Sequence, residues 1–470
     1  MTAEAISPQA TSRADRRWLS RDWLPWLGLV LPMVLLTILA LRDLDMYSLW
    51  RDEVSSVVFA KGSLGDLLTI IGRDRQEVGL ANMATYYLIL HFWLLLGENE
   101  ATIRLLSVIF GVASVVPVFF VARRIGGWLA AGLAAGIFVL IPFVIHYNQE
   151  ARGYSLAILL AGAMTWLLLI GVERREQWWP WLAYGVLAAL GLYVHFFLAL
   201  VVAAHGLWVL ATRQVPPWRS TLAAVVPFAL AVAPMPFIVA EFGAEHGWIP
   251  PLNVNRVLVA MQKLAGGPLL LIALPTLLAI GAVIRRRDPR YWLLVASTAG
   301  PVLAVIAVSL VKPMLIPRYL VVVLPSLAVA AGVTLAVLRP PLLRAPMAAG
   351  LAVALLVSLP NAYFTATNID WRTAGGWLAE EAVPGDKIVM QSWRDSPLDY
   401  YMQRSGPSAI LERIGFDEAR AGQEDRVWLA LFGIEEPAVS QTVAELLLRY
   451  DVLEKRTFGP RATIFLLRPL

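Results

Sequence analysis

The sequence predicts an all-α polytopic membrane protein with about eleven transmembrane helices, a large first outer loop with interfacial helices, and a small C-terminal α/β domain. Three observations predict this fold class. Hydrophobic residues make up 58% of the 470 residues and charged residues only 16%; the mean hydropathy is +0.65, which is too apolar for a soluble chain of this length. Apolar stretches of bilayer length recur, with short basic loops between them. The period-two alternation of a membrane β-barrel is missing.

The overall charge and the absence of cysteine exclude two other classes of protein. The net charge is +5, but the basic residues stand in short clusters between apolar runs, where they act as topology signals. We therefore expect no nucleic-acid partner. Because the chain has no cysteine, disulfide frameworks and thiolate metal sites are excluded.

The N-terminal segment is expected to be a cytoplasmic tail followed by the first span. Residues 1–22 carry several arginines, and the uncharged run from Trp23 to Leu41 is longer than the apolar region of a signal peptide. Residues 23–363 are then expected to form the transmembrane domain, with residues 45–104 as its large outer loop.

The other spans are predicted from the length of each apolar run. They cover residues 105–122, 128–146, 154–172, 180–195, 197–211, 222–240, 268–284, 291–311, 319–338 and 346–363.

Alternating these spans from a cytoplasmic N-terminus satisfies the positive-inside rule at each basic loop. The alternation requires the apolar stretch Tyr86–Leu96 to be an interfacial helix, because it is too short to span a bilayer. The loops expected to be cytoplasmic contain Arg123, Arg124, Arg174, Arg175, Arg213, Arg219, Arg285, Arg286, Arg287, Arg290, Arg339 and Arg344.

The odd number of spans is expected to carry residues 364–470 to the outer, extracytoplasmic side, where they form the α/β domain. Its pattern predicts a helix over Trp371–Ala382 and a turn at Pro384–Asp386. Strands are predicted at Lys387–Met390, Arg426–Phe432 and Ala462–Leu467.

Two acidic residues follow the first span closely. Asp52 and Glu53 stand beside Arg51 and the aromatic Trp50, which would set a base at the membrane surface. The alternative is an interfacial helix cap with solvated charges.

Further polar residues are expected in later outer loops. One loop contains Glu150, Arg152 and Tyr154, and His195 stands at a tight turn. Lys312, Arg318 and Tyr319 flank a turn bracketed by prolines that could hold an anion. Arg318 could instead contact lipid headgroups, and His195 could serve only in packing.

These motifs together resemble those of the GT-C glycosyltransferases: Leu49–Glu53, Gly97–Ser107, Gln149–Ser155 and Pro317–Tyr319. Within that superfamily the chain is most similar to the bacterial branch of protein O-mannosyltransferases, aminoarabinose transferases and rhizobial galacturonosyltransferases. The resemblance covers most of the chain. It departs at Glu77–Leu80, where relatives usually carry a proline pair.

The resemblance implies a glycosyltransferase of the cytoplasmic (inner) membrane. Such enzymes move a sugar from a polyprenyl-phosphate donor to a hydroxyl of an envelope glycan, a lipid or a protein on the outer face. Inverting transfer needs one base, for which Asp52 is the candidate, with Glu53 orienting the base or the acceptor.

The growing charge on the leaving phosphate needs cations. Arg318 is the first candidate, followed by Arg152 and Lys312, with Tyr319 nearby. Glu150, Arg104, His195 and Tyr154 are supporting or acceptor-side candidates; Arg104 is expected to brace the carboxylates by an ion pair.

No cofactor is required by these residues, although Asp52, Glu53 and Glu150 could hold a divalent cation such as Mg²⁺ or Mn²⁺. Two other functions stay open. A transporter or flippase of lipid-linked substrates would also have many spans, but ionisable residues are almost absent from them. The third alternative is a non-catalytic partner in envelope assembly.

Overall fold

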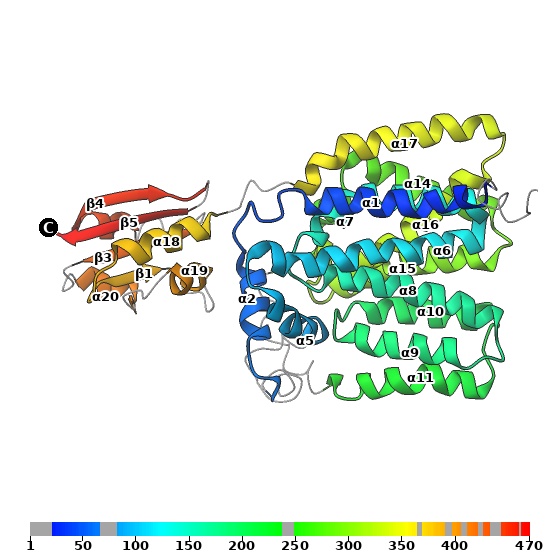
Figure 1. Cartoon of the computed structure of the whole chain (residues 1–470), viewed down its shortest axis with the longest axis horizontal. Coiled ribbons are helices and arrows are strands. Elements are labelled where there is room, and N and C mark those ends of the chain that lie inside the picture. Colours follow the sequence, from blue (N-terminus) through cyan, green and yellow to red (C-terminus); the bar gives the residue numbers. More distant parts are fainter. Residues whose placement is uncertain are drawn as a thin grey trace, which may run out of the picture.

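The computed structural model describes residues 21–65, 82–236, 249–363, 369–390, 397–405, 411–421, 426–432, 443–459 and 462–470. A helical bundle forms most of it, and a small α/β domain lies beyond one end of the bundle (Figure 1). Most of the expected N-terminal tail and the segment Glu77–Leu80 lie outside the described residues.

The bundle consists of helices that follow the predicted apolar runs. Its described elements are η2 (Arg21–Trp26), α1 (Leu27–Leu41), α2 (Arg51–Ala60), α5 (Ala84–Trp93), η3 (Leu94–Leu96), α6 (Glu100–Leu140), α7 (Pro142–Asn148), α8 (Tyr154–Glu173), α9 (Trp179–Leu192), α10 (Leu198–Ala211), α11 (Trp218–Val232), α13 (Val254–Ala265), α14 (Pro268–Ile284), α15 (Pro289–Ser309), η5 (Pro317–Val323), α16 (Leu324–Val337), η6 (Pro341–Leu343), α17 (Arg344–Ser358) and η7 (Leu359–Tyr363).

Several of these helices are long and apolar enough to cross a bilayer. Among the described residues there are six, or up to seven if α13 and α14, which meet at an 82° bend, are taken as one broken span. The helices α9, α10 and α11 are apolar but shorter. A multi-span membrane protein is therefore confirmed, while the number eleven stays a prediction.

The longest helix joins two predicted spans. The α6 helix runs through residues 105–122 and 128–146 as far as Leu140, but Gly127 inside it has φ 80° and interrupts the helical backbone. Glycine adopts this left-handed conformation without a steric penalty. The interruption falls beside Arg123 and Arg124, where the sequence predicts a loop.

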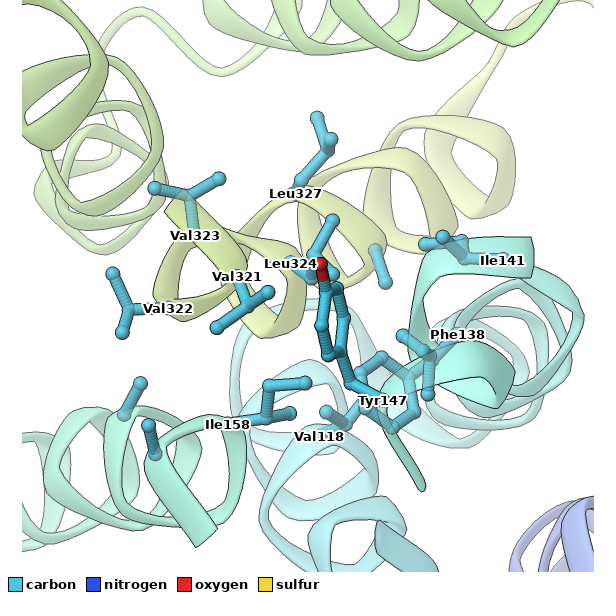
Figure 2. Packing of buried hydrophobic residues seen from close by; sticks show 14 of the residues in the cluster. Val118, Phe138, Ile141, Tyr147, Ile158, Val321, Val322, Val323, Leu324 and Leu327 are labelled. Atoms are coloured by element: carbon cyan, nitrogen blue, oxygen red, sulfur yellow. The ribbon is translucent and has the colours of Figure 1, made fainter. Parts of the chain in front are cut away.

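The core of the bundle is the pair α6 and α16. The α16 helix is apolar on all sides, as expected for a helix enclosed by others. Figure 2 shows Leu324 of α16 beside Tyr147 of α7, with Val118 and Phe138 of α6 and Ile158 of α8 nearby; all belong to one buried cluster. This packing fixes η5, which leads directly into α16, against α8.

The stretch predicted to lie in the interface forms α5 and η3, which together are too short to span a bilayer. The α5 helix packs beside α2 at the end of the bundle that faces the small domain (Figure 1). The His91 ring shares a 2.7 Å hydrogen bond with the Ala60 carbonyl, and the Tyr86 and Ser107 hydroxyls are 3.1 Å apart. These contacts hold α2 against the bundle.

The C-terminal domain is a sheet with helices on both faces. Within the described residues the strand order is β2-β1-β3-β5-β4; β2, β1 and β3 are parallel, and β5 is antiparallel to β3 and β4. Its elements are α18 (Trp371–Glu381), β1 (Lys387–Met390), α19 (Pro397–Ser405), β2 (Glu412–Ile414), α20 (Phe416–Ala421), β3 (Val427–Phe432), β4 (Tyr450–Thr457) and β5 (Ala462–Pro469).

The predicted helix and the predicted strands of this domain are all present, as α18, β1, β3 and β5. The sequence did not indicate β2, α19, α20 or β4. The β2 strand has only three residues. The β4 strand lies at the edge of the sheet and is rich in charged residues, a common protection of edge strands that hides the apolar alternation.

The close approach of α16 to α6 predicts a stability effect. A Cβ atom on Gly332 would lie 2.5 Å from the Ala134 backbone nitrogen, whereas one on Gly136 would meet nothing within 4 Å. Gly332→Ala is expected to destabilise the fold by about 1–3 kcal/mol because it forces the two helices apart. Thermal unfolding in detergent should show a loss for Gly332→Ala and none for Gly136→Ala; equal melting temperatures would contradict the packing.

Candidate active site

The two acidic residues after the first span lie in the first turn of α2, which follows the N-cap residue Trp50. Negative charge is favourable there because the first N–H groups of a helix lack helical partners. The Trp50 backbone N–H donates to Glu53 Oε2 over 3.2 Å. Adjacent helical residues point about 100° apart, so Asp52 and Glu53 face different surroundings.

Glu53 is fully buried and its carboxylate is enclosed by donors. Arg104 donates to it twice, from Nε to Oε1 over 2.8 Å and from Nη2 to Oε2 over 2.7 Å. The Ala151 backbone N–H donates to Oε1 over 2.9 Å. The carboxylate therefore joins α2, α6 and the loop before α8.

Arg104 also fixes the chain that leads into α2. Its Nη1 donates to the carbonyls of Leu44 and Tyr47, both over 2.8 Å, and its Nη2 to the Ser48 carbonyl over 3.2 Å. The expected ion pair of Arg104 with a carboxylate is thus present, and Glu53 is the carboxylate.

Asp52 remains accessible. Its Oδ2 lies 3.6 Å from Arg318 Nη2, and both side chains are about a quarter exposed, 24% for Asp52 and 25% for Arg318. The separation is longer than a hydrogen bond. The acid and the guanidinium therefore face each other, and both are partly accessible to a ligand.

Arg152 also lies close to Asp52. Its Nη1 donates to the Asp52 carbonyl over 3.1 Å, to Ser56 Oγ over 3.2 Å and to Tyr87 Oη over 3.1 Å. One guanidinium thus ties α2 to α5 and brings a second positive charge to Asp52.

Arg318 is positioned by η5, which begins at Pro317. Its guanidinium lies 5.9 Å from the centre of the Trp50 ring, a cation–π distance. The next residue, Tyr319, packs on Phe197 with 4.8 Å between ring centroids and on His195 with 5.5 Å. The rings form an apolar wall beside the cations.

His195 is buried between these rings and the arginines. Its Nδ1 accepts a hydrogen bond from the Phe197 backbone N–H over 3.3 Å, which assigns the proton of the neutral ring to Nε2. Burial, with Arg152 and Arg318 nearby, lowers the pKa of His195 to about 3. The side chain is therefore an uncharged donor at neutral pH.

Glu150 joins the same region through His146. The His146 Nε2 lies 3.2 Å from Glu150 Oε1. The ring of Tyr154 stacks edgewise on Tyr147, with centroids 4.7 Å apart. The Tyr154 ring also lies 5.7 Å from the His195 ring, so Tyr154 reaches the cluster directly.

Two expectations for the site find no support. Lys312 forms no side-chain hydrogen bond or ion pair within the described part of the chain, so nothing there joins it to the cluster. The suggested divalent-cation set of Asp52, Glu53 and Glu150 does not fit, because Arg104 occupies both oxygens of Glu53. No group of three or more potential ligand residues occurs among the described residues.

Several buried polar atoms of the cluster lack a hydrogen-bond partner among the described residues. Buried polar atoms are normally paired, and further unpaired atoms lie elsewhere in the described residues, for example at Ser297 and Trp377; those near Asp52 fit a polar ligand that would pair with them. They are Trp50 Nε1, Glu150 Oε2, Arg152 Nε, His195 Nε2 and Arg318 Nε.

The sequence did not indicate the roles of Trp50, Ser56, Tyr87 and Tyr147 in the site. Tyr87 and Ser56 contact Arg152, and Tyr147 packs against Tyr154. The spacing of Ser56 four residues after Asp52, one helical turn away, was the available signal. For Tyr147 and Tyr87 the sequence contains no signal that would distinguish a tyrosine of the site from an ordinary aromatic residue at the membrane interface.

Comparison with known proteins gives a family match and a fold. The family model for dolichyl-phosphate-mannose-protein mannosyltransferase matches residues 82–239. No curated protein sequence matches the chain.

Among solved structures, ArnT from Cupriavidus metallidurans in the apo state has a TM-score of 0.63 at 15% identity, with 96% of this chain and 98% of ArnT covered. ArnT bound to undecaprenyl phosphate has a TM-score of 0.61 at 15% identity, covering 95% and 98%. The Archaeoglobus fulgidus oligosaccharyltransferase with zinc and sulfate has a TM-score of 0.53 at 12% identity, covering 94% of this chain and 75% of that protein.

The chain therefore has the GT-C fold over nearly its whole length, as the resemblance implied. The described residues place an acid, two arginines and a neutral histidine together at one end of that fold. The fold similarity to ArnT covers 96% of this chain and so extends through the C-terminal domain.

The buried fork between Arg104 and Glu53 predicts a large stability effect. Arg104→Met is expected to cost about 3–5 kcal/mol, because it leaves the Glu53 carboxylate buried without its cation. Arg42→Met removes the exposed pair with Asp43, whose side chains are 65% and 50% exposed, and should cost less than about 1 kcal/mol. Similar small losses of unfolding free energy in both variants would contradict the role of the fork.

Proposed function

We propose that this chain is an inverting membrane glycosyltransferase, which moves a sugar from a polyprenyl-phosphate donor to an acceptor hydroxyl on the outer face of the cytoplasmic membrane. The observation that carries the proposal is the accessible Asp52 carboxylate 3.6 Å from Arg318, inside a fold shared with ArnT. Undecaprenyl phosphate bound to ArnT supports a lipid-linked donor.

Asp52 acts as the general base. Its free carboxylate oxygen accepts the proton of the acceptor hydroxyl while the hydroxyl oxygen attacks the anomeric carbon of the sugar. The new glycosidic bond forms as the bond from the anomeric carbon to the phosphate oxygen breaks, so the configuration inverts. The polyprenyl phosphate leaves with the electron pair. The acceptor is an envelope glycan, a lipid or a protein.

The cations stabilise the leaving phosphate. Arg318 and Arg152 flank Asp52, and each has a buried Nε without a partner among the described residues. A guanidinium fork matches phosphate oxygens in geometry as well as charge. The uncharged His195 Nε2–H adds a donor, and Tyr319 lies against the same wall.

Glu53 and Arg104 position the base without touching the substrates. Their oxygens and nitrogens are engaged with each other and with the backbone, so Glu53 acts by holding α2. Glu150 and Tyr154 line the acceptor side. We assign no step to a metal ion, because Arg104 occupies both oxygens of Glu53 in the ligand set considered.

The proposed orientation sets the N-terminus in the cytoplasm and the C-terminal domain outside. The predicted cytoplasmic loops support it, because they contact one another: Arg290 Nη1 donates to the Arg124 carbonyl over 3.1 Å, and Arg285 Nη2 to the Ile125 carbonyl over 2.9 Å. Arg124 also pairs with Glu173. A cationic end opposite the acidic site is the pattern expected of an inner-membrane protein.

A transporter is the main alternative, because His205 lies inside α10. Its ring nitrogens are 3.3 Å from Thr165 Oγ1 and 3.0 Å from Tyr184 Oη, so both nitrogens have partners, which favours a role in helix packing. Buried polar atoms without a partner among the described residues occur around Asp52, but also inside the bundle, for example at Trp166, Ser297 and Thr298. The preference for chemistry at one face, over transport or a non-catalytic assembly role, therefore rests on the accessible Asp52 and Arg318 facing each other at one end of the bundle.

Replacing the base tests the reaction directly. Asp52→Asn should lower the rate of sugar transfer by about 10²- to 10⁴-fold, since a positioned base contributes about that factor. The measurement is acceptor-dependent consumption of radiolabelled polyprenyl-phosphate sugar by purified protein. Asp43→Asn, an exposed acid before α2, is the matched control and should keep the wild-type rate. Near-normal transfer by Asp52→Asn would rule out this base.

Replacing the fork by a point charge tests the phosphate site. Arg318→Lys keeps the charge but loses bidentate hydrogen bonding, so its transfer rate should fall by at least about tenfold, the equivalent of one lost charge-assisted hydrogen bond. Lys312→Arg serves as the control for charge in the same loop. If Arg318→Lys kept the full wild-type rate, Arg318 would contact headgroups only.

A further inference from the structure

One side chain of the C-terminal domain belongs to the packing of the bundle. Tyr401 lies on α19, and its ring packs into the main core of the bundle, whereas its neighbours Leu398 and Met402 pack into the core of their own domain. Only 4% of Tyr401 is exposed. The helix thus inserts the buried Tyr401 across the boundary between the two parts, and the partly buried Tyr400 packs against the same core.

The Tyr401 hydroxyl uses both of its hydrogen-bonding capacities there. It accepts from the Leu49 backbone N–H over 2.7 Å and donates to Glu100 Oε1 over 2.8 Å. Burial raises the pKa of Tyr401, so the hydroxyl keeps the proton that it donates. Leu49 is itself fully buried, and its N–H therefore depends on this partner.

These two partners connect the hydroxyl to the candidate base. Leu49 directly precedes Trp50, the N-cap of α2, and Asp52 lies in the first turn of that helix. Glu100 lies four residues before Arg104 on α6, so the two side chains share a helix face. The segment before α2 is therefore held by Arg104 through its carbonyls and by Tyr401 through an N–H.

Other hydrogen bonds would keep the C-terminal domain in contact with the bundle if the Tyr401 hydroxyl were removed. Ser48 Oγ donates to the Ile369 carbonyl over 2.9 Å and accepts from the Trp371 N–H over 3.0 Å. Arg372 Nε donates to Glu100 Oε1 over 3.0 Å. Removing only the Tyr401 oxygen should thus loosen Leu49 and leave the domain attached.

We propose that Tyr401 is a positioning residue for the transfer reaction: through the Leu49 N–H it fixes the start of α2 and thereby the direction of the Asp52 carboxylate. The C-terminal domain would then complete the active site without touching the substrates. The effect on catalysis rests on the proposed function, whereas the hydrogen bond between the Leu49 N–H and the Tyr401 hydroxyl does not depend on it.

The test compares Tyr401→Phe with Tyr400→Phe in the full-length protein. The control removes the neighbouring hydroxyl on the same helix, which accepts from Arg404 over 2.9 Å and has no contact with Leu49. Hydrogen exchange of the segment 44–56 should be at least about tenfold faster at the Leu49 amide in Tyr401→Phe only, because a lost partner favours local opening. Melting temperatures should stay similar.

In the radiolabel assay, Tyr401→Phe should lower kcat by about tenfold while the KM for the donor stays near that of the wild type, because misplacing a catalytic group by a fraction of an ångström affects the chemical step. Because a loss of folded protein would also lower the apparent kcat at constant KM, kcat is calculated per folded enzyme, with the folded fraction taken from the melting curves. Gly375→Ala is a second probe, since a Cβ there would lie 2.6 Å from Tyr401 Cβ and should shift the intact hydroxyl, with the same effects on exchange and kcat.

Unchanged exchange at Leu49 in Tyr401→Phe would overturn the link, whatever the assay shows. Faster exchange with a wild-type kcat would overturn the positioning role. If the wild-type protein transferred no sugar, the proposed function would fail, and with it the catalytic role, while the exchange result would still decide whether Tyr401 holds the start of α2.

Discussion

The arrangement of the site depends on one buried ion pair, the bidentate contact of Arg104 with Glu53. Two buried charges lose their hydration, and only good geometry with further hydrogen bonds compensates that loss. Both conditions are met, because Glu53 also accepts from backbone N–H groups and Arg104 also donates to backbone carbonyls. The pair thereby fixes the loop before α2, the first turn of α2 and the loop before α8 relative to α6.

Asp52 is accessible because Glu53 is not. The two acids are adjacent, so the helix turns one inward and the other toward Arg318. Arg318 comes from η5, which the core between α6 and α16 holds in place (Figure 2). A rigid apolar bundle therefore supports a polar cluster whose buried atoms still lack partners, which is the arrangement expected of a preorganised site. The C-terminal domain adds the contact of Tyr401 from the opposite side.

Much of the fold could be predicted from the sequence, because each apolar run of bilayer length and each basic loop is recognised from its own residues, without knowledge of tertiary contacts. Asp52 and Arg318 were predicted for the same reason, as charged residues beside apolar runs. The pairing of Glu53 with Arg104 in atomic detail and the contact of Tyr401 with Leu49 depend on tertiary packing between distant residues. The spacing of residues in the sequence does not indicate such contacts. The separate roles of Asp52 and Glu53, and the contribution of the C-terminal domain, could therefore be inferred only from the structure.

The central claim is that Asp52 and Arg318 face the phosphate end of one lipid-linked donor. A structure of the protein with bound undecaprenyl phosphate tests it most directly. We predict that the phosphate lies within hydrogen-bond distance of the Arg318 guanidinium, with Asp52 on the side from which an acceptor hydroxyl would approach. A phosphate bound at a distance from Arg318, with the Asp52 carboxylate turned away from it, would contradict the account.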